Sequence, residues 1–277
     1  MGGYKIAELH ESSLSSDPAA PLIVLLHGFG ASTFTWRGLI PALREIGEVW
    51  AYDRPGFGFT DAPSSWVGTN PYSIEGQVEF LSERVEQLAE GRRVIVLGHS
   101  SGGQLATYFA FARPDLVSAL VLVSPALRSA GLPRQFEWLM RNPLMDWLGP
   151  KATKGFDKVG MKILFDSVHD KRVLTTDMVA GYRAPMDDPR WVNRFWEFLR
   201  APQPRDQKVA AAAVACPTLI VTGDDDKIIP VGETRANAEL YVDHRLVLIE
   251  QTGHLSFEEK PDEFMAHIRA NLQWLLP

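Results

Sequence analysis

Cysteine is almost absent from this sequence, since Cys216 is the single one among 277 residues. One thiol can form no disulfide within the chain and cannot build a Cys-rich zinc site. Long apolar runs are also missing: stretches such as 209–216 fall far short of the ~18 residues that span a membrane. Residues 1–11 contain one lysine and no apolar core of a signal peptide. We therefore expect a soluble, cytoplasmic protein that does not bind membranes.

An excess of basic residues is missing as well. Lys and Arg number 28 and Asp and Glu number 34, which gives a formal net charge of −6. An acidic chain is a poor candidate for nucleic-acid binding, and we expect a small-molecule partner instead. Apolar residues make up 45% of the chain and charged residues 22%, which are ordinary values for a globular protein with a large core.

Six short apolar runs recur along the chain and alternate with helical patterns. The runs are nearly continuous, which is typical of strands buried on both faces of a parallel sheet. Apolar residues at positions 74, 78, 81, 85 and 88 lie on one face of a helix, and further helices are expected before Pro114 and from Pro261. This alternation predicts an α/β fold with a mostly parallel, doubly wound sheet. The expected strands are 22–27, 49–53, 94–98, 120–124, 219–222 and 246–250.

Residues 127–205 interrupt this pattern. They contain no strand-like run, several prolines, four of the eight Trp and five of the seven Met, with 14 Lys and Arg against 9 Asp and Glu. We predict a helical cap over 127–205, inserted between two strands of a core made of 1–126 and 206–277. Bulky, adaptable side chains suit the wall of an apolar pocket. The expected substrate-binding residues are Trp138, Met140, Trp147 and Met161 of the cap and Leu255 of the core.

The strongest local signal is the sequence Gly98-His99-Ser100-Ser101-Gly102. It follows an apolar run and precedes a helical pattern, the context in which G-x-S-x-G forms a nucleophile elbow. We expect a turn so tight that a Cβ on either glycine would clash, with Ser100 held in a strained conformation. Ser100 is therefore the candidate nucleophile.

A serine hydroxyl needs a general base, and the base needs a carboxylate to orient it. His254 directly follows the strand expected at 246–250, and loops at the carboxyl ends of parallel strands carry functional groups. The acid is expected after the strand at 219–222, in the order Ser…Asp…His. Three adjacent aspartates leave its identity open: Asp224, Asp225 and Asp226.

Five motifs in order make the chain resemble an α/β-hydrolase over nearly its whole length. The motifs are His27-Gly28-Phe29-Gly30, Asp53-Arg54-Pro55-Gly56-Phe57-Gly58, Gly98-His99-Ser100-Ser101-Gly102, Gly223-x-x-Asp226 with Pro230, and Gly253-His254 with Glu258, Pro261 and Phe264. The resemblance implies Asp226 as the acid and the backbone N–H groups of Phe29 and Ser101 as the oxyanion hole. It implies a structural role for the loop 53–58. Such a site uses neither a metal nor another cofactor, and we expect none.

The residue types around the site narrow the reaction. Similar dehalogenases and epoxide hydrolases use Asp at the position of Ser100, so their alkyl-enzyme chemistry is disfavoured. Carbon–carbon bond hydrolases of aromatic-ring degradation commonly have Asn before the serine and Trp after the histidine, where this chain has His99 and Leu255. We expect a serine hydrolase of carboxylic esters with short to medium apolar acyl groups. A carbon–carbon bond hydrolase, a hydrolase of thioesters, lactones or amides, and a small-molecule receptor with a slow triad stay open as alternatives.

Overall fold

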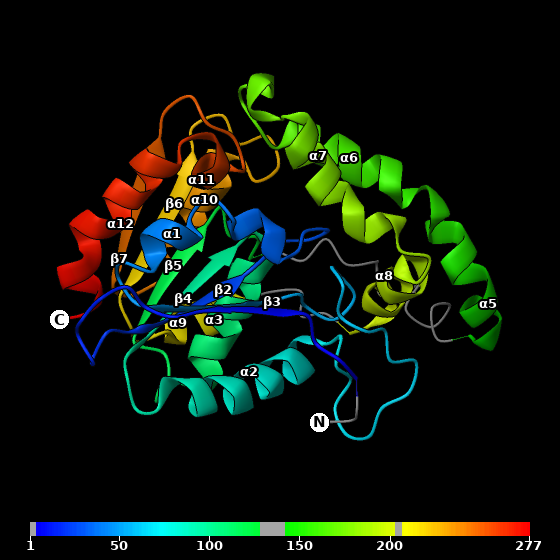
Figure 1. Ribbon diagram of the computed structural model, residues 1–277, viewed down its shortest axis with the longest axis horizontal. Coiled ribbons are helices and arrows are strands. Elements are labelled where there is room, and N and C mark those ends of the chain that lie inside the picture. The colour runs from blue at the N-terminus through cyan, green and yellow to red at the C-terminus, as the bar shows by residue number, and fades with distance from the viewer. Residues whose placement is uncertain (1–3, 128–141, 203–206) are drawn as a thin grey trace.

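The computed structural model describes residues 4–127, 142–202 and 207–277, and a seven-stranded sheet lies at its centre (Figure 1). The strand order is β1-β3-β2-β4-β5-β6-β7, and every strand is parallel to its neighbours except β1, which pairs antiparallel with β3. The strands are β1 (Glu8–Glu11), β2 (Leu22–Leu26), β3 (Glu48–Tyr52), β4 (Val94–His99), β5 (Ala119–Val123), β6 (Thr218–Gly223) and β7 (His244–Ile249). Six of these strands confirm the sequence prediction to within two residues at either end.

Helices cover both faces of the sheet, as the sequence predicts. One face carries α2 (Ile74–Ala89), α3 (Ser101–Ala112), α9 (Lys208–Ala213) and α10 (Val231–Ala238). The other carries the short helices α1 (Ile40–Leu43) and α11 (Ser256–Glu259) and the long helix α12 (Pro261–Leu275). The predicted helices are confirmed: α2 buries one stripe of apolar residues, α3 ends before Pro114, and α12 begins at Pro261.

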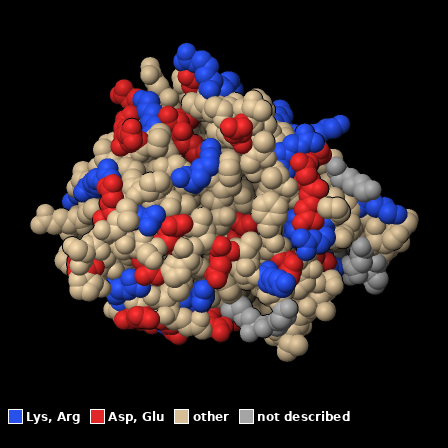
Figure 2. Space-filling view, in the orientation of Figure 1, with Lys and Arg blue, Asp and Glu red and all other residues tan. Residues whose placement is uncertain are grey.

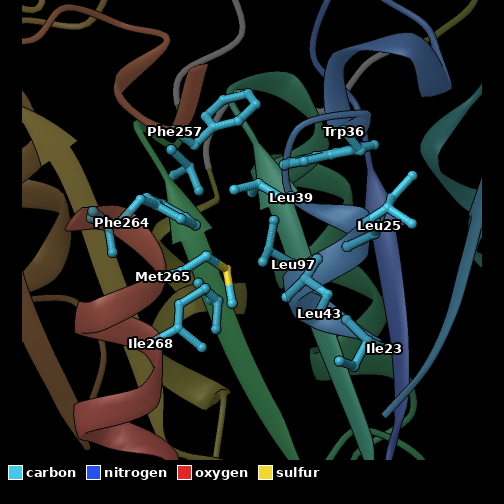
Figure 3. Close-up of a cluster of buried hydrophobic side chains, with 14 of the residues drawn as sticks. Ile23, Leu25, Trp36, Leu39, Leu43, Leu97, Phe257, Phe264, Met265 and Ile268 are labelled. Atoms are coloured by element: carbon cyan, nitrogen blue, oxygen red, sulfur yellow. The ribbon is translucent and has the colours of Figure 1, made fainter. Parts of the chain in front are cut away.

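Alternate residues of each central strand feed two separate cores. On β2, Leu22 and Val24 belong to the core on the side of α2 and α3, whereas Ile23 and Leu25 belong to the core on the side of α1 and α12. Figure 3 shows the second core, with Ile23 and Leu25 on one side of it and Phe264, Met265 and Ile268 of α12 on the other. Trp36 closes its upper end by stacking on Phe257 with ring centroids 4.9 Å apart. Because both faces are buried, the strands need apolar side chains at every position, which explains their continuous apolar runs.

A helical cap is inserted between β5 and β6, as predicted. Its helices are α5 (Pro143–Ala152), α6 (Phe156–Asp166), α7 (Thr176–Arg183) and α8 (Trp191–Arg200), with 3-10 turns at Thr153–Gly155, Lys171–Val173 and Ala184–Asp187. The described residues of this insertion contain no strand. In Figure 1 these helices lie to one side of the sheet. The boundaries 127 and 205 of a separate cap domain stay a prediction.

The cap packs on the core through two apolar contacts. Phe195 and Phe198 of α8 pack with Phe57 of the core. Leu164 of α6 and Met178 of α7 join the core cluster that includes α12. Side chains from three helices of the cap therefore pack against the core.

The face of the molecule in Figure 2 is mixed in charge. Figure 2 shows acidic and basic side chains interspersed over one face of the molecule. Within the part of the chain that the structure describes, every helix is too short or too polar to cross a membrane.

The turn between β4 and α3 is closed to side-chain carbons on both sides of Ser100. A Cβ on Gly98 would lie 2.6 Å from the carbonyl oxygen of Gly102, and a Cβ on Gly102 would lie 2.0 Å from the carbonyl oxygen of Leu26. Neither obstacle can move, because both are backbone atoms at the centre of the sheet. The predicted steric need for both glycines is confirmed.

We therefore expect Gly102→Ala to lower the free energy of unfolding by about 2–3 kcal/mol, because overpacked cores force backbone shifts. Gly232→Ala is the matched control, since nothing lies within 4 Å of the position that its Cβ would occupy on α10. That variant should be as stable as the parent or more stable by up to about 1 kcal/mol. Urea denaturation measures both, and equal stability of the Gly102 variant and the parent would contradict the steric argument.

Candidate active site

Ser100 occupies the tight turn where β4 passes into α3. Its backbone has φ 53° and ψ −118°, a strained conformation for a residue with a side chain. Neighbouring strands hold it there: the Ser100 N–H donates to the Val123 carbonyl at 2.9 Å, and the Ser100 carbonyl accepts from Gly103 at 2.9 Å and Ala126 at 3.1 Å. The side chain lines a cavity under the cap. The strain that the sequence predicts is confirmed.

His254 and Asp226 lie on the same side of the sheet, in the loops after β7 and β6. The His254 Nδ1 and the Asp226 Oδ2 are 2.8 Å apart, and both side chains are buried. The other oxygen, Asp226 Oδ1, accepts hydrogen bonds at 2.9 Å from the backbone N–H groups of Ile228 and Ile229. Burial favours a raised pKa for Asp226, but the hydrogen bond from His254 and those from the backbone outweigh it and hold the pKa below its ordinary value. Asp226 is therefore ionised at neutral pH.

The neighbouring aspartate has different partners. Asp225 lies 2.8 Å from Nδ1 of His169 and 3.1 Å from the ammonium of Lys227, at the molecular surface. Of the three adjacent aspartates, Asp226 alone contacts His254 within the part of the chain that the structure describes.

Two backbone N–H groups next to Ser100 are available to a ligand. Neither the Phe29 N–H nor the Ser101 N–H donates to another described residue. Phe29 and Ser100 line the same cavity. The Phe29 ring is 40% exposed and lies between the core and the cap, in edge contact with Phe57 and Phe195. The Phe29 ring is therefore not fully enclosed in the core.

His27 and His99 support this geometry without being charged. The His27 Nδ1 donates to the Gly28 carbonyl at 2.8 Å, and its Nε2 accepts from the Arg54 backbone N–H at 2.9 Å. Burial and the Arg54 charge lower the pKa of His27 to about 3. His99 Nε2 donates to the His254 carbonyl at 3.1 Å, and burial and the adjacent His254 hold the pKa of His99 well below its usual range. Both imidazole rings are therefore neutral and help to hold the backbone around the site.

The loop that begins at Asp53 lies beside the site, and hydrogen bonds to the Asp53 carboxylate stabilise its conformation. The Asp53 carboxylate accepts from the Thr33 N–H at 2.7 Å and from the Phe59 N–H at 2.8 Å. A Cβ on Gly58 would lie 2.1 Å from that carboxylate. This geometry agrees with the structural role that the resemblance implies.

Ser100 and His254 open into one cavity of about 160 Å³ between core and cap. Its wall is mostly apolar. Core residues form the floor, and α6, α7 and the turn after α7 form the roof. The lining residues are Phe29, Gly30, Ala31, Thr35, His99, Ser100, Gly160, Met161, Ile163, Leu164, Ser167, Tyr182, Met186, Ile228, His254 and Leu255.

Two of the five expected substrate-binding residues line this cavity, namely Met161 and Leu255. Trp147 does not: it is 63% exposed on α5, where the Lys151 ammonium lies 3.1 Å from its ring centroid. The amphipathic helix turns this side chain to the outside. Trp138 and Met140 lie outside the described residues.

Sequence reasoning missed the polar part of the wall. The hydroxyls of Thr35 and Tyr182 are 2.6 Å apart, and both bond to the Glu258 carboxylate, which also pairs with Arg37 at 2.6 Å. Burial raises the pKa of Glu258 against the effect of Arg37. These residues come from three separate segments, so no single local motif could have shown that they meet. The wall hydroxyls are occupied by one another and by Glu258, which leaves the cavity suited to apolar groups.

The roof contributed by α6 did carry a sequence signal. Gly160, Met161, Ile163 and Leu164 follow helical spacing and point to one side of the helix. The described residues contain no cluster of three side chains able to hold a metal ion.

Comparison with known proteins agrees with this architecture. Residues 21–261 match the family described as alpha/beta hydrolase fold. The hydrolase YugF of Bacillus subtilis is 28% identical over 255 residues, which are 91% of this chain and 90% of that protein. The 2-hydroxy-6-oxo-6-(2'-aminophenyl)hexa-2,4-dienoic acid hydrolase of Metapseudomonas resinovorans is 27% identical over 87% of this chain and 80% of its own.

Among solved structures, a thermophilic esterase from Thermogutta terrifontis superimposes with a TM-score of 0.77 over 99% of this chain and 95% of its own, at 20% identity. That likeness concerns the fold. Together with the sheet order, the strained serine turn and the family match over most of the sequence, it leads to one assignment. The chain belongs to the α/β-hydrolase-fold family, and it is a hydrolase.

Proposed function

We propose that this protein is a serine hydrolase that cleaves carboxylic esters through an acyl-enzyme. The observation that carries the proposal is the 2.8 Å contact between His254 and Asp226, because His254 lines the same cavity as Ser100. A strained serine, a buried histidine and an ionised carboxylate are the three parts of a nucleophilic triad.

In the proposed reaction, Ser100 Oγ attacks the ester carbonyl while His254 Nε2 takes its proton. Asp226 holds the imidazole by Nδ1, which leaves Nε2 as the proton acceptor. The carbonyl oxygen becomes an alkoxide, which the N–H groups of Phe29 and Ser101 stabilise. His254 then protonates the leaving alcohol as the carbon–oxygen bond breaks. Water cleaves the acyl-enzyme by the same route and restores Ser100.

The volume and the uncharged lining of the cavity favour substrates with small, uncharged acyl groups. A cavity of about 150 Å³ holds one benzene molecule, and this one measures about 160 Å³. None of the described lining residues is Lys, Arg, Asp or Glu. A short aliphatic or compact aromatic acyl group therefore fits better than a long lipid chain or an acyl group with its own carboxylate.

Carbon–carbon bond hydrolysis is the second candidate. The Metapseudomonas relative, which is named as a dienoic acid hydrolase, supports it through 27% identity over most of the chain. The absence of a cationic side chain from the described cavity lining argues against a substrate with a free carboxylate. Turnover of an ester and of a vinylogous diketone by the same preparation decides between the two.

Ser100 should carry the covalent intermediate. A fluorophosphonate should add to Ser100 and stop turnover, and peptide mapping by mass spectrometry locates the adduct. Ser100→Ala should lose most activity and keep its unfolding midpoint, because the Ser100 hydroxyl forms no hydrogen bond to another described residue. An adduct on any other residue would overturn the assignment.

Asp226→Asn should lower kcat by about 10³- to 10⁴-fold, because an amide cannot hold the imidazole in the required tautomer. Asp225→Asn is the matched control, with the same chemical change one residue away. It removes a surface contact to His169 and should change kcat by less than about threefold. Steady-state kinetics on one ester measures both, and the reverse ranking would move the acid to Asp225.

The value of kcat/KM should be highest for esters with short acyl chains. Each buried methylene contributes ~0.8 kcal/mol, which is about fourfold in kcat/KM until the cavity is full. We expect kcat/KM on p-nitrophenyl esters to rise from acetate to butyrate or hexanoate and to fall by octanoate. A value that still rises at palmitate would contradict a closed cavity of this size.

A further inference from the structure

Arg54 is fully buried beside Ser101 and forms no ion pair with a described residue. Its side chain is 1% exposed, and it contacts no carboxylate among the described residues. Arg194 shows the usual alternative, since it is equally buried but pairs with Asp188 at 3.0 Å. Burial lowers the pKa of Arg54 to about 10, so the guanidinium is still charged at neutral pH. The titratable group that acts on it is the phenol of Tyr52, which is neutral because burial raises its pKa.

The Arg54 guanidinium joins the two segments that flank Ser100. One terminal nitrogen donates to the His27 carbonyl at 3.1 Å and to the Ser101 hydroxyl at 3.0 Å. Its Nε donates to the side-chain oxygen of Gln77 at 2.9 Å, which fixes the plane of the group. His27 begins the loop that carries Phe29, and Ser101 begins α3. A single side chain thus sets the distance between the two backbone N–H groups proposed to bind the oxyanion.

The backbone of Arg54 adds a second restraint on the same loop. Its N–H donates to Nε2 of His27, which makes Nδ1 the protonated nitrogen, and Nδ1 donates to the Gly28 carbonyl. A trans peptide points its carbonyl and its N–H in opposite directions. Holding the Gly28 oxygen on one side therefore aims the Phe29 N–H to the other.

A buried charge without a counter-charge is costly to a fold, and an apolar side chain of similar length would avoid that cost. The negative charge that balances Arg54 can be that of the alkoxide, because the alkoxide forms next to Ser101 during the reaction. In a low-dielectric interior, a fixed positive charge nearby favours that negative charge more than water would.

We propose that Arg54 is a positioning residue for the oxyanion hole: its guanidinium joins the Phe29 loop to the Ser101 turn and places an unpaired positive charge beside the developing alkoxide. This inference rests on the ester hydrolysis proposed above. It separates Arg54 from the rest of the loop 53–58, whose role is structural.

The test compares Arg54→Met with Arg194→Met on p-nitrophenyl butyrate. Arg54→Met should lower kcat at least tenfold with KM within about threefold, because the oxyanion exists in the transition state and not in the bound ester. Arg194→Met removes an equally buried guanidinium from the cap and should lower the unfolding midpoint, with kcat within about threefold. Arg54→Lys keeps the charge and should recover part of the lost kcat.

A transition-state analogue separates positioning from general damage to the fold. A trifluoromethyl ketone forms a tetrahedral alkoxide adduct with the serine, so its inhibition constant should rise in Arg54→Met by the factor by which kcat/KM falls. A folded Arg54→Met with kcat within twofold of the parent overturns the proposal. A lost kcat with an unchanged inhibition constant also overturns it.

If Arg54→Met does not fold, Ser101→Ala decides the question. This small change leaves the Ser101 backbone N–H in place and removes the hydroxyl that Arg54 holds. It should lower kcat about three- to tenfold, and a parental kcat overturns the proposal. Failure of the parent protein to cleave any ester would instead overturn the proposed function, and the two failures are distinguished by assaying the parent first.

Discussion

The turn after β4 leaves no room for a side-chain carbon on either glycine beside Ser100, and the rest of the site depends on this constraint. Backbone atoms of Gly102 and Leu26 close the turn on both sides. Ser100 therefore takes a strained backbone conformation at the edge of the sheet, with its N–H held by β5. The same close approach brings the His27-Gly28 loop beside the start of α3. The Phe29 and Ser101 N–H groups that donate to no other described residue belong to these two segments.

The other two residues of the site, Asp226 and His254, come together because the carboxyl ends of parallel strands share one edge of the sheet. The loop after β6 carries Asp226 and the loop after β7 carries His254, which gives contact between residues 28 positions apart in sequence. The cap closes over this edge. Its polar link to the core, from Tyr182 to Glu258, ends on α11, the helix that follows the His254 loop. One buried carboxylate therefore connects the cap to the helix that follows His254.

Much of the fold could be predicted because strands buried on both faces must be apolar throughout. β1 was not predicted because it is not buried on both faces. Its residues alternate between exposed and partly buried positions and include Glu8 and Glu11. The choice among Asp224, Asp225 and Asp226 could not come from spacing, because adjacent residues in a turn point in different directions. The likeness to a family indicated Asp226, and the structure brings that residue to His254 and Asp225 to His169. Trp147 shows that composition identifies a cap but not which face of a helix meets the cavity.

The central claim is that turnover passes through an acyl group on Ser100. Rapid quenching of the protein with p-nitrophenyl butyrate, followed by mass analysis of its peptides, tests this claim most directly. The account predicts a burst of nitrophenol and one butyryl group per chain, attached to the peptide that contains Ser100, before the steady state. Steady turnover with no acylated peptide at any time, or an acyl group on another residue, would contradict it.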